Sequence, residues 1–187
     1  MNIFFNLPNF FTLLRILLIP VLIIIFYLPF HWVNMTTAII FTIASFTDWL
    51  DGYLARKLGQ LSYFGAFLDP VADKLLVATS LLLLVSANEI HYITLPAIII
   101  VGREIVISAL REWMAEIGRR ASVAVNYIAK VKTGMQMLAI ILLLASSSAS
   151  SGWKILGCIF LYLSSILTIW SMITYIKIAW PDLIKKN

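Results

Sequence analysis

The chain is organised around residues 48–73, DWLDGYLARKLGQLSYFGAFLDPVAD, which place four aspartates in a sequence that is otherwise typical of a membrane protein. Asp48 and Asp51 are three residues apart, and Asp69 and Asp73 are four apart. At these spacings the two members of each pair lie on one face of a helix, one turn from each other. Each pair could therefore share a cation, and such oxygen ligands favour Mg²⁺, Mn²⁺ or Ca²⁺.

The residues after the first pair are suited to a phosphate ligand. Gly52 removes a side chain where a ligand could approach the backbone, Ala55 keeps the next turn small, and Arg56 offers a planar, permanent charge for phosphate oxygens. The alternative is that the aspartates only end helices at the membrane surface, paired with Arg56, Lys57 and Lys74. Two helical pairs of carboxylates favour a functional site, because ionisable residues in membrane segments usually have a function.

The composition predicts an all-α integral membrane protein. Of the 187 residues, 61% are hydrophobic and 12% charged, and the mean hydropathy is +0.96, whereas soluble domains are about 45–50% apolar and about 25% charged. At about 20 residues per span, the length supports one domain, residues 1–187, with six transmembrane helices. We expect a short N-terminal interfacial helix within residues 6–15 and spans at about 13–30, 34–57, 63–86, 92–115, 127–146 and 153–178.

The distribution of basic residues predicts the orientation. Thirteen of the fourteen lysines and arginines fall at or near one face of the predicted bundle, and Lys154 lies at the other. Because basic residues accumulate on the cytoplasmic side, we expect both termini and both aspartate pairs to face the cytoplasm. The net charge of +5 suggests contact with anionic headgroups or substrates. No basic surface with interleaved aromatic residues is apparent, which argues against a nucleic-acid partner.

A polar stripe precedes the first span. Asn9, Thr12 and Arg15 recur every three residues and so share one face of a short helix. This face could line the catalytic site, or Arg15 could extend its charge to lipid phosphates at the membrane surface. The sequence leaves both interpretations open.

The aspartate-rich stretch resembles the signature of the CDP-alcohol phosphotransferases. In that family an acceptor alcohol attacks the β-phosphorus of a CDP-linked lipid or alcohol, and CMP leaves. All eight positions of the motif are filled, in the order Asp48-x-x-Asp51-Gly52-x-x-Ala55-Arg56, eight further residues, and Gly65-x-x-x-Asp69-x-x-x-Asp73.

This resemblance implies a role for each motif residue. Two Mg²⁺ or Mn²⁺ ions would be held by four aspartates, namely Asp48, Asp51, Asp69 and Asp73. Asp73 would also take the proton of the acceptor, as the catalytic base. The CDP-lipid would be bound by Gly52, Ala55, Arg56 and Gly65, with Asn9 and Thr12 of the N-terminal stripe.

Further stretches resemble bacterial members that use CDP-diacylglycerol as donor and glycerol 3-phosphate as acceptor. They are GAFLDPVADK, REIVISALREWMAEIG, AKVKTGMQM and the N-terminal PN-x-x-T-x-x-R. The resemblance implies a multi-pass enzyme of the bacterial cytoplasmic (inner) membrane, in contact with membrane lipid, with a cytoplasmic active site and a homodimeric assembly. It also implies a pocket for the acceptor phosphate.

The residues expected in that pocket are Arg103, Arg111, Lys130 and Lys132. The two arginines are about two turns apart on a predicted helix and can flank one site. The two lysines, two residues apart, point to roughly opposite faces, so one of them is expected to point inward. The alternative is that all four anchor the protein to lipid phosphates.

Two other functions remain open. A related enzyme with another acceptor, such as inositol phosphate, serine or phosphatidylglycerol, would share the signature. A cation-coupled transporter would also place carboxylates in the membrane. Against a transporter, both acid pairs lie near one face rather than the midplane, and no internal repeat or pair of broken helices is apparent.

Overall fold

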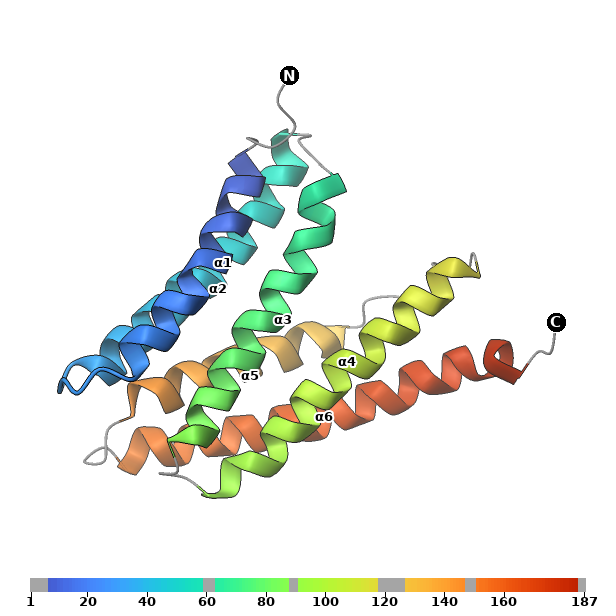
Figure 1. Cartoon of the computed structure of the whole chain (residues 1–187). Coiled ribbons are helices and arrows are strands. Elements are labelled where there is room, and N and C mark those ends of the chain that lie inside the picture. The colour runs from blue at the N-terminus through green and yellow to red at the C-terminus, as the bar shows by residue number, and fades with distance from the viewer. Residues whose placement is uncertain (1–6, 59–62, 88–90, 118–126, 147–150, 185–187) are drawn as a thin grey trace.

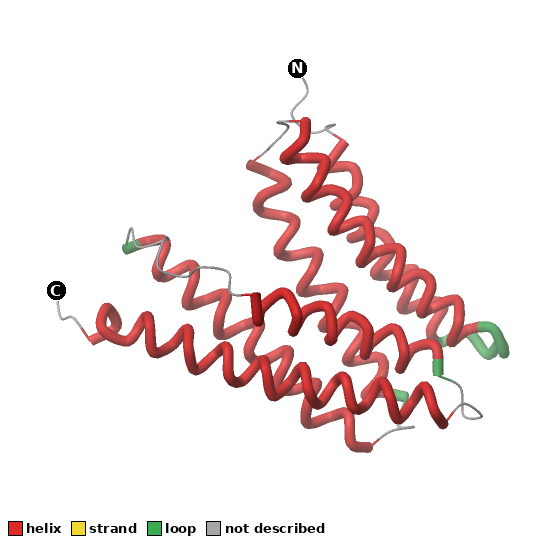
Figure 2. Tube along the Cα trace, turned by 180° about the vertical axis from the view of Figure 1, so that it is seen from behind, coloured by secondary structure: helices red, strands yellow, loops and turns green. Residues whose placement is uncertain are grey.

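The computed structural model describes residues 7–58, 63–87, 91–117, 127–146 and 151–184. All regular structure within these residues is helical, which confirms the predicted all-α class (Figure 2). In this part of the chain a 3₁₀ turn, η2 (His91–Ile93), and six α-helices are present (Figure 1): α1 Leu7–Phe26, α2 Val33–Leu58, α3 Tyr63–Ser86, α4 Thr94–Glu116, α5 Tyr127–Ala145 and α6 Ser151–Ile184.

The distribution of side chains differs from that in a soluble protein. About two-thirds of the surface of many large apolar side chains is exposed, for example Leu17 65%, Leu82 64%, Ile105 65% and Trp170 67%. Several polar side chains also lie inside, beside the buried apolar ones, and those at most 1% exposed include Arg15, Thr37, Ser80, Lys132 and Ser164. Soluble proteins bury apolar residues and expose charged ones, so this pattern is the one expected when lipid surrounds the helices.

Two helices contain a stretch that is long and apolar enough to cross a membrane. These stretches are Asn9–Phe26, with a mean hydropathy of 2.4, and Gly152–Trp180, with a mean hydropathy of 1.9. Val131–Ala145 is apolar but shorter. The six predicted spans thus correspond to six helices, of which two meet this measure within the described residues.

The first helix differs from the prediction. We expected a short interfacial helix followed by a separate span, but α1 is one helix from Leu7 to Phe26. No glycine or proline lies between Asn9 and Pro20, so nothing in the local sequence interrupts the helix. Its polar stripe is buried rather than interfacial, because this face packs against α2 and α3.

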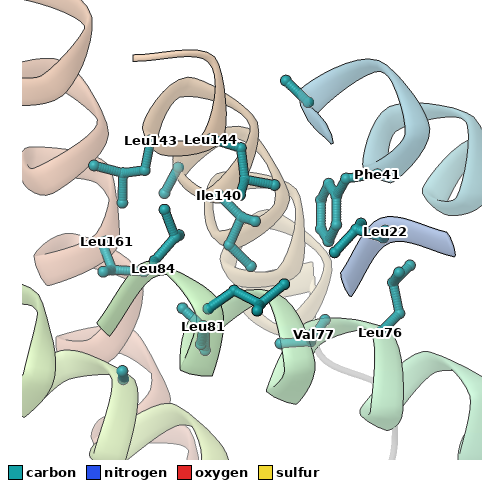
Figure 3. Packing of buried hydrophobic residues seen from close by; sticks show 14 of the residues in the cluster. Leu22, Phe41, Leu76, Val77, Leu81, Leu84, Ile140, Leu143, Leu144 and Leu161 are labelled. Carbon is teal, nitrogen blue, oxygen red and sulfur yellow. The ribbon is translucent and has the colours of Figure 1, made fainter. Parts of the chain in front are cut away.

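A continuous apolar core joins the helices. α1 packs against α2 and α3, α5 packs against α2 and α6, and α4 packs mainly against α6. Figure 1 shows α1, α2 and α3 standing together, while α4 and α6 lie in a second group. Figure 3 shows leucines of α3 facing α5 in this core, which includes Leu22, Phe41, Leu76, Leu81, Leu84, Ile140, Leu143 and Leu161.

A glycine allows α5 and α6 to approach closely. A Cβ atom added at Gly157 would lie 2.8 Å from Leu143 Cγ and 3.3 Å from the carbonyl oxygen of Ala139. The first distance is shorter than normal carbon contacts of about 3.5–4.0 Å. The missing side chain therefore helps to fix the distance between these helices.

Candidate active site

Arg15 of α1 joins carboxylates from two other helices. Its Nη1 atom lies 3.0 Å from Asp48 Oδ1 on α2 and donates a hydrogen bond to Asp73 Oδ1 on α3. The arginine side chain is fully buried, whereas the two aspartate side chains are 41% and 39% exposed. Because both oxygens contact one nitrogen, they lie no more than ~6 Å apart.

A second contact links α1 to α3 one turn away. The hydroxyl group of Thr12 donates a hydrogen bond of 2.6 Å to Asp69 Oδ1. Thr12 precedes Arg15 by one turn and Asp69 precedes Asp73 by one turn, so the polar stripe of α1 faces the acidic face of α3 at two levels. The predicted meeting of the two aspartate pairs is therefore seen for Asp48, Asp69 and Asp73.

The sequence left two interpretations of the polar stripe open: it could line the catalytic site, or Arg15 could extend to lipid phosphates. The structure decides between them. Arg15 does not extend to the membrane surface; it is 0% exposed and pairs with two carboxylates. Asn9, one turn earlier on the same face, is 2% exposed. The stripe therefore belongs to the candidate site.

The other motif positions are placed only in part. Asp51, Gly52, Ala55 and Arg56 lie on α2 near its end, but their side chains fall outside the described part of the structure. Gly65 is buried at the start of α3. The predicted involvement of these residues in donor binding remains a prediction.

The carboxylates fit a divalent cation by their chemistry. Three aspartates supply only oxygen ligands, the type that Mg²⁺ and Mn²⁺ prefer, and two of them already surround one positive group, the Arg15 guanidinium. Among the described residues, no three acidic, histidine or cysteine side chains are close enough together to form a metal site. Of the described aspartates, Asp48 and Asp73 contact Arg15, and Asp69 contacts Thr12.

A second cluster, here called the basic cluster, consists of Arg103 and Arg111 on α4 and Lys132 on α5. Arg103 and Lys132 are only 7% and 1% exposed. Arg103 Nη1 lies 2.8 Å from Glu104 Oε1, and Arg103 Nη2 donates a hydrogen bond of 3.3 Å to Ser171 Oγ on α6. Lys132 Nζ lies 3.7 Å from the same Glu104 oxygen. The structure therefore brings Arg103 and Lys132 together, as the sequence predicted.

Arg111 lies at the exposed edge of this cluster. Its Nη2 is 3.4 Å from Tyr175 Oη, and its guanidinium carbon lies 5.5 Å from the centre of the Tyr175 ring. Of the two lysines, Lys132 points inward; the side chain of Lys130 falls outside the described residues. Burial of Arg103 and Lys132 contradicts the interpretation that these two residues anchor the protein to lipid phosphates.

The sequence interpretation did not identify three residues that contact the basic cluster, namely Glu104, Ser171 and Tyr175. The sequence offered a signal for Glu104, because this acidic residue directly follows Arg103 within an apolar run. Ser171 and Tyr175 are four residues apart and so share a face of α6, but they lie in an apolar run that contains other serines and tyrosines. Only the packing of α4 against α6 distinguishes them.

A contact between α2 and α5 joins the helices that carry Asp48 and Lys132. Ser45 Oγ on α2 donates a hydrogen bond to Met137 Sδ on α5 at 3.8 Å. Asp48 follows Ser45 by about one turn toward the end of α2, and Lys132 precedes Met137 by more than one turn toward the start of α5.

Comparison with known proteins adds independent information. A family model described as CDP-alcohol phosphatidyltransferase matches residues 5–170. A Pseudomonas fluorescens protein named CDP-diacylglycerol–glycerol-3-phosphate 3-phosphatidyltransferase is 54% identical over 179 residues, covering 95% of this chain and 92% of the relative. Proteins of the same name from Salmonella choleraesuis (strain SC-B67) and Yersinia enterocolitica serotype O:8 are 50% and 49% identical, covering 96% of this chain and 98% of each relative.

Proposed function

The chain belongs to the CDP-alcohol phosphatidyltransferase family, and we propose that it transfers the phosphatidyl group of CDP-diacylglycerol to glycerol 3-phosphate. The products are phosphatidylglycerol phosphate and CMP. The observation that carries this conclusion is identity of about half the residues, over nearly the whole chain, with relatives named for this reaction. The geometry agrees with it, because the helices carry one group of carboxylates at Arg15 and a second group of buried cations at Glu104.

The donor side of the reaction is assigned to α1, α2 and α3. Asp48, Asp51, Asp69 and Asp73 would hold two divalent ions, Mg²⁺ or Mn²⁺, which neutralise phosphate oxygens and the charge that develops on the leaving CMP. Thr12 orients Asp69 by its hydrogen bond. The CDP group would be bound by the flanking residues, namely Asn9, Thr12, Gly52, Ala55, Arg56 and Gly65.

Asp73 is the proposed catalytic base. Its carboxylate would accept the proton of the acceptor hydroxyl group as that oxygen attacks the β-phosphorus and CMP leaves. Arg15 contacts one oxygen of this carboxylate and so fixes its orientation. The carboxylate is 39% exposed, which allows a substrate to approach it.

The acceptor side is assigned to α4, α5 and α6. The phosphate group of glycerol 3-phosphate carries up to two negative charges and would bind Arg103, Arg111 and Lys132, with Lys130 nearby in sequence. Arginine is suited to this because its planar group can donate two hydrogen bonds to one phosphate. Three cations from two helices support an anionic acceptor over serine or another neutral alcohol.

The membrane arrangement is also proposed. Six spans in the bacterial cytoplasmic membrane, with the active site facing the cytoplasm, are supported by the exposed apolar side chains and by the clustering of basic residues at one end. The acyl chains of CDP-diacylglycerol would then stay in lipid while its diphosphate reaches the aspartates. A homodimer is proposed on the family resemblance alone.

A CMP-release assay tests this function. Purified protein in detergent with Mg²⁺ and CDP-diacylglycerol should release CMP when glycerol 3-phosphate is added. Inositol phosphate, serine and phosphatidylglycerol should give little release at the same concentration. Preferred use of one of these three would reassign the acceptor, and no release with any acceptor would contradict the enzyme assignment.

A further inference from the structure

Glu104 links the two buried cations of the basic cluster. Its Oε1 atom lies 2.8 Å from Arg103 Nη1 and 3.7 Å from Lys132 Nζ. A single carboxylate oxygen on α4 therefore holds together one cation of its own helix and one cation of α5. Glu104 is 28% exposed at its side chain, whereas Arg103 and Lys132 are nearly enclosed.

The contact with Arg103 is not a consequence of helix geometry. Adjacent residues project about 100° apart around a helix and do not normally face each other. Arg103 instead bends so that one nitrogen reaches Glu104 while the other reaches Ser171 of α6. The arginine is thus fixed between two partners on different helices, and Glu104 is the charged one.

Without the Glu104 carboxylate, the positive charges of Arg103 and Lys132 would repel each other and move apart. Arg103 and Lys132 both contact one atom, so their charged groups are close, and like charges repel more strongly away from water. Lys132 has four rotatable bonds and could turn away, whereas a phosphate group needs both cations to point to one place. A negative group between them removes the repulsion and keeps their directions fixed.

We propose that Glu104 is a positioning residue, which holds Arg103 and Lys132 in a common direction for the phosphate group of the acceptor. This inference rests on the proposed function, in which these cations bind glycerol 3-phosphate. Glu104 itself does not bind the substrate, because its carboxylate and the phosphate are both negative. It acts through the two cations.

The test compares Glu104→Ala, Glu104→Gln and a control, Glu112→Ala, in the CMP-release assay with both substrates varied. Glu112 lies on the same helix two turns away and its side chain is exposed. Glu104→Ala should raise KM for glycerol 3-phosphate about tenfold, with KM for CDP-diacylglycerol changed less than about twofold. Glu104→Gln keeps an oxygen that can accept from Arg103 but loses the charge that attracts Lys132, so its effect should be smaller. Glu112→Ala should match the wild type.

Inorganic phosphate supplies a second measurement. It should inhibit the wild type in competition with glycerol 3-phosphate, and Glu104→Ala should raise its inhibition constant by a similar factor. A merely structural role would instead lower activity toward both substrates equally. If Glu104→Ala does not fold, Glu104→Gln carries the same comparison.

Three results would overturn the inference: unchanged kinetics, equal changes for the two substrates, or tighter binding of the acceptor in Glu104→Ala. A wild-type protein that does not use glycerol 3-phosphate would contradict the proposed function instead. The two failures are therefore distinguished by the wild-type control.

Discussion

Arg15 Nη1 on α1 and Asp48 Oδ1 on α2 lie 3.0 Å apart. The arginine side chain is fully buried, whereas the aspartate side chain is partly exposed. The same nitrogen contacts Asp73. A permanent cation therefore lies among carboxylates that the family signature associates with metal ions. This arrangement allows two carboxylates to lie close together, because the arginine offsets their repulsion.

The first prediction concerns stability without metal. Arg15→Met should lower the free energy of unfolding in EDTA by on the order of 2 kcal/mol, less than for a fully enclosed pair because both aspartates are partly exposed. Excess Mg²⁺ should restore part of this loss by neutralising the same carboxylates. Melting temperatures of the detergent-solubilised protein with and without Mg²⁺ measure it. A control, Lys177→Met at an exposed position, should change neither value, and a loss unaffected by Mg²⁺ would contradict the explanation.

The second prediction concerns turnover. Asp48→Asn, Asp69→Asn and Asp73→Asn should each lower kcat by a factor of about 100 or more, because each removes a charged oxygen from the metal and base site. EDTA should abolish CMP release by the wild type, and Mg²⁺ or Mn²⁺ should restore it. Glu116→Gln, at an exposed position of α4, serves as the control. Near-normal activity of the three variants in EDTA would exclude metal-assisted catalysis.

The third prediction concerns the acceptor. Arg103→Ala and Arg111→Ala should raise KM for glycerol 3-phosphate much more than KM for CDP-diacylglycerol. Each lost charge-assisted hydrogen bond is worth on the order of 1.5–3 kcal/mol, about tenfold or more in affinity. Initial rates with both substrates varied provide the measurement. Equal effects on the two substrates would remove these arginines from the acceptor site.

The fourth prediction concerns orientation in the membrane. Cysteine introduced at Lys57, near the end of α2, should be protected from an impermeant thiol reagent in intact cells, whereas cysteine at Gly152 should react. Both positions are exposed, and Cys158→Ser provides a background without the native thiol. Reaction in the opposite order would reverse the proposed topology.

The fifth prediction concerns the contact between α5 and α6. Gly157→Ala places a methyl group 2.8 Å from Leu143 Cγ and should destabilise the protein by about 1–3 kcal/mol, as overpacking does. Gly152→Ala on the same helix is a matched control, because a Cβ there meets no atom within 4 Å. Thermal unfolding of the two variants should differ; equal melting temperatures would show that the helices move apart easily.

Local sequence predicted the helices well, since each apolar run is bounded by turn residues. The prediction of a separate interfacial helix at the start of α1 was wrong, because the local sequence does not indicate whether a polar stripe contacts lipid, water or another helix. The aspartate pairs were predicted from their spacing alone. The link of Asp73 to Arg15 was not predicted, because it joins residues 58 positions apart in sequence and depends on how α1 packs against α3. Ser171 and Tyr175 escaped prediction for the same reason.

The positions of Arg15 and Ser171, near opposite ends of the chain, bear on biosynthesis. A nascent protein emerges from its N-terminus onward, so Arg15 can meet Asp48 and Asp73 as soon as α3 has been made. Arg103 can contact Ser171 only after most of α6, the last of the described helices, has been translated. The ribosome thus completes one half of the proposed active site well before the other. A prematurely terminated product that lacks α6 would retain the aspartates while leaving Arg103 without its hydroxyl partner.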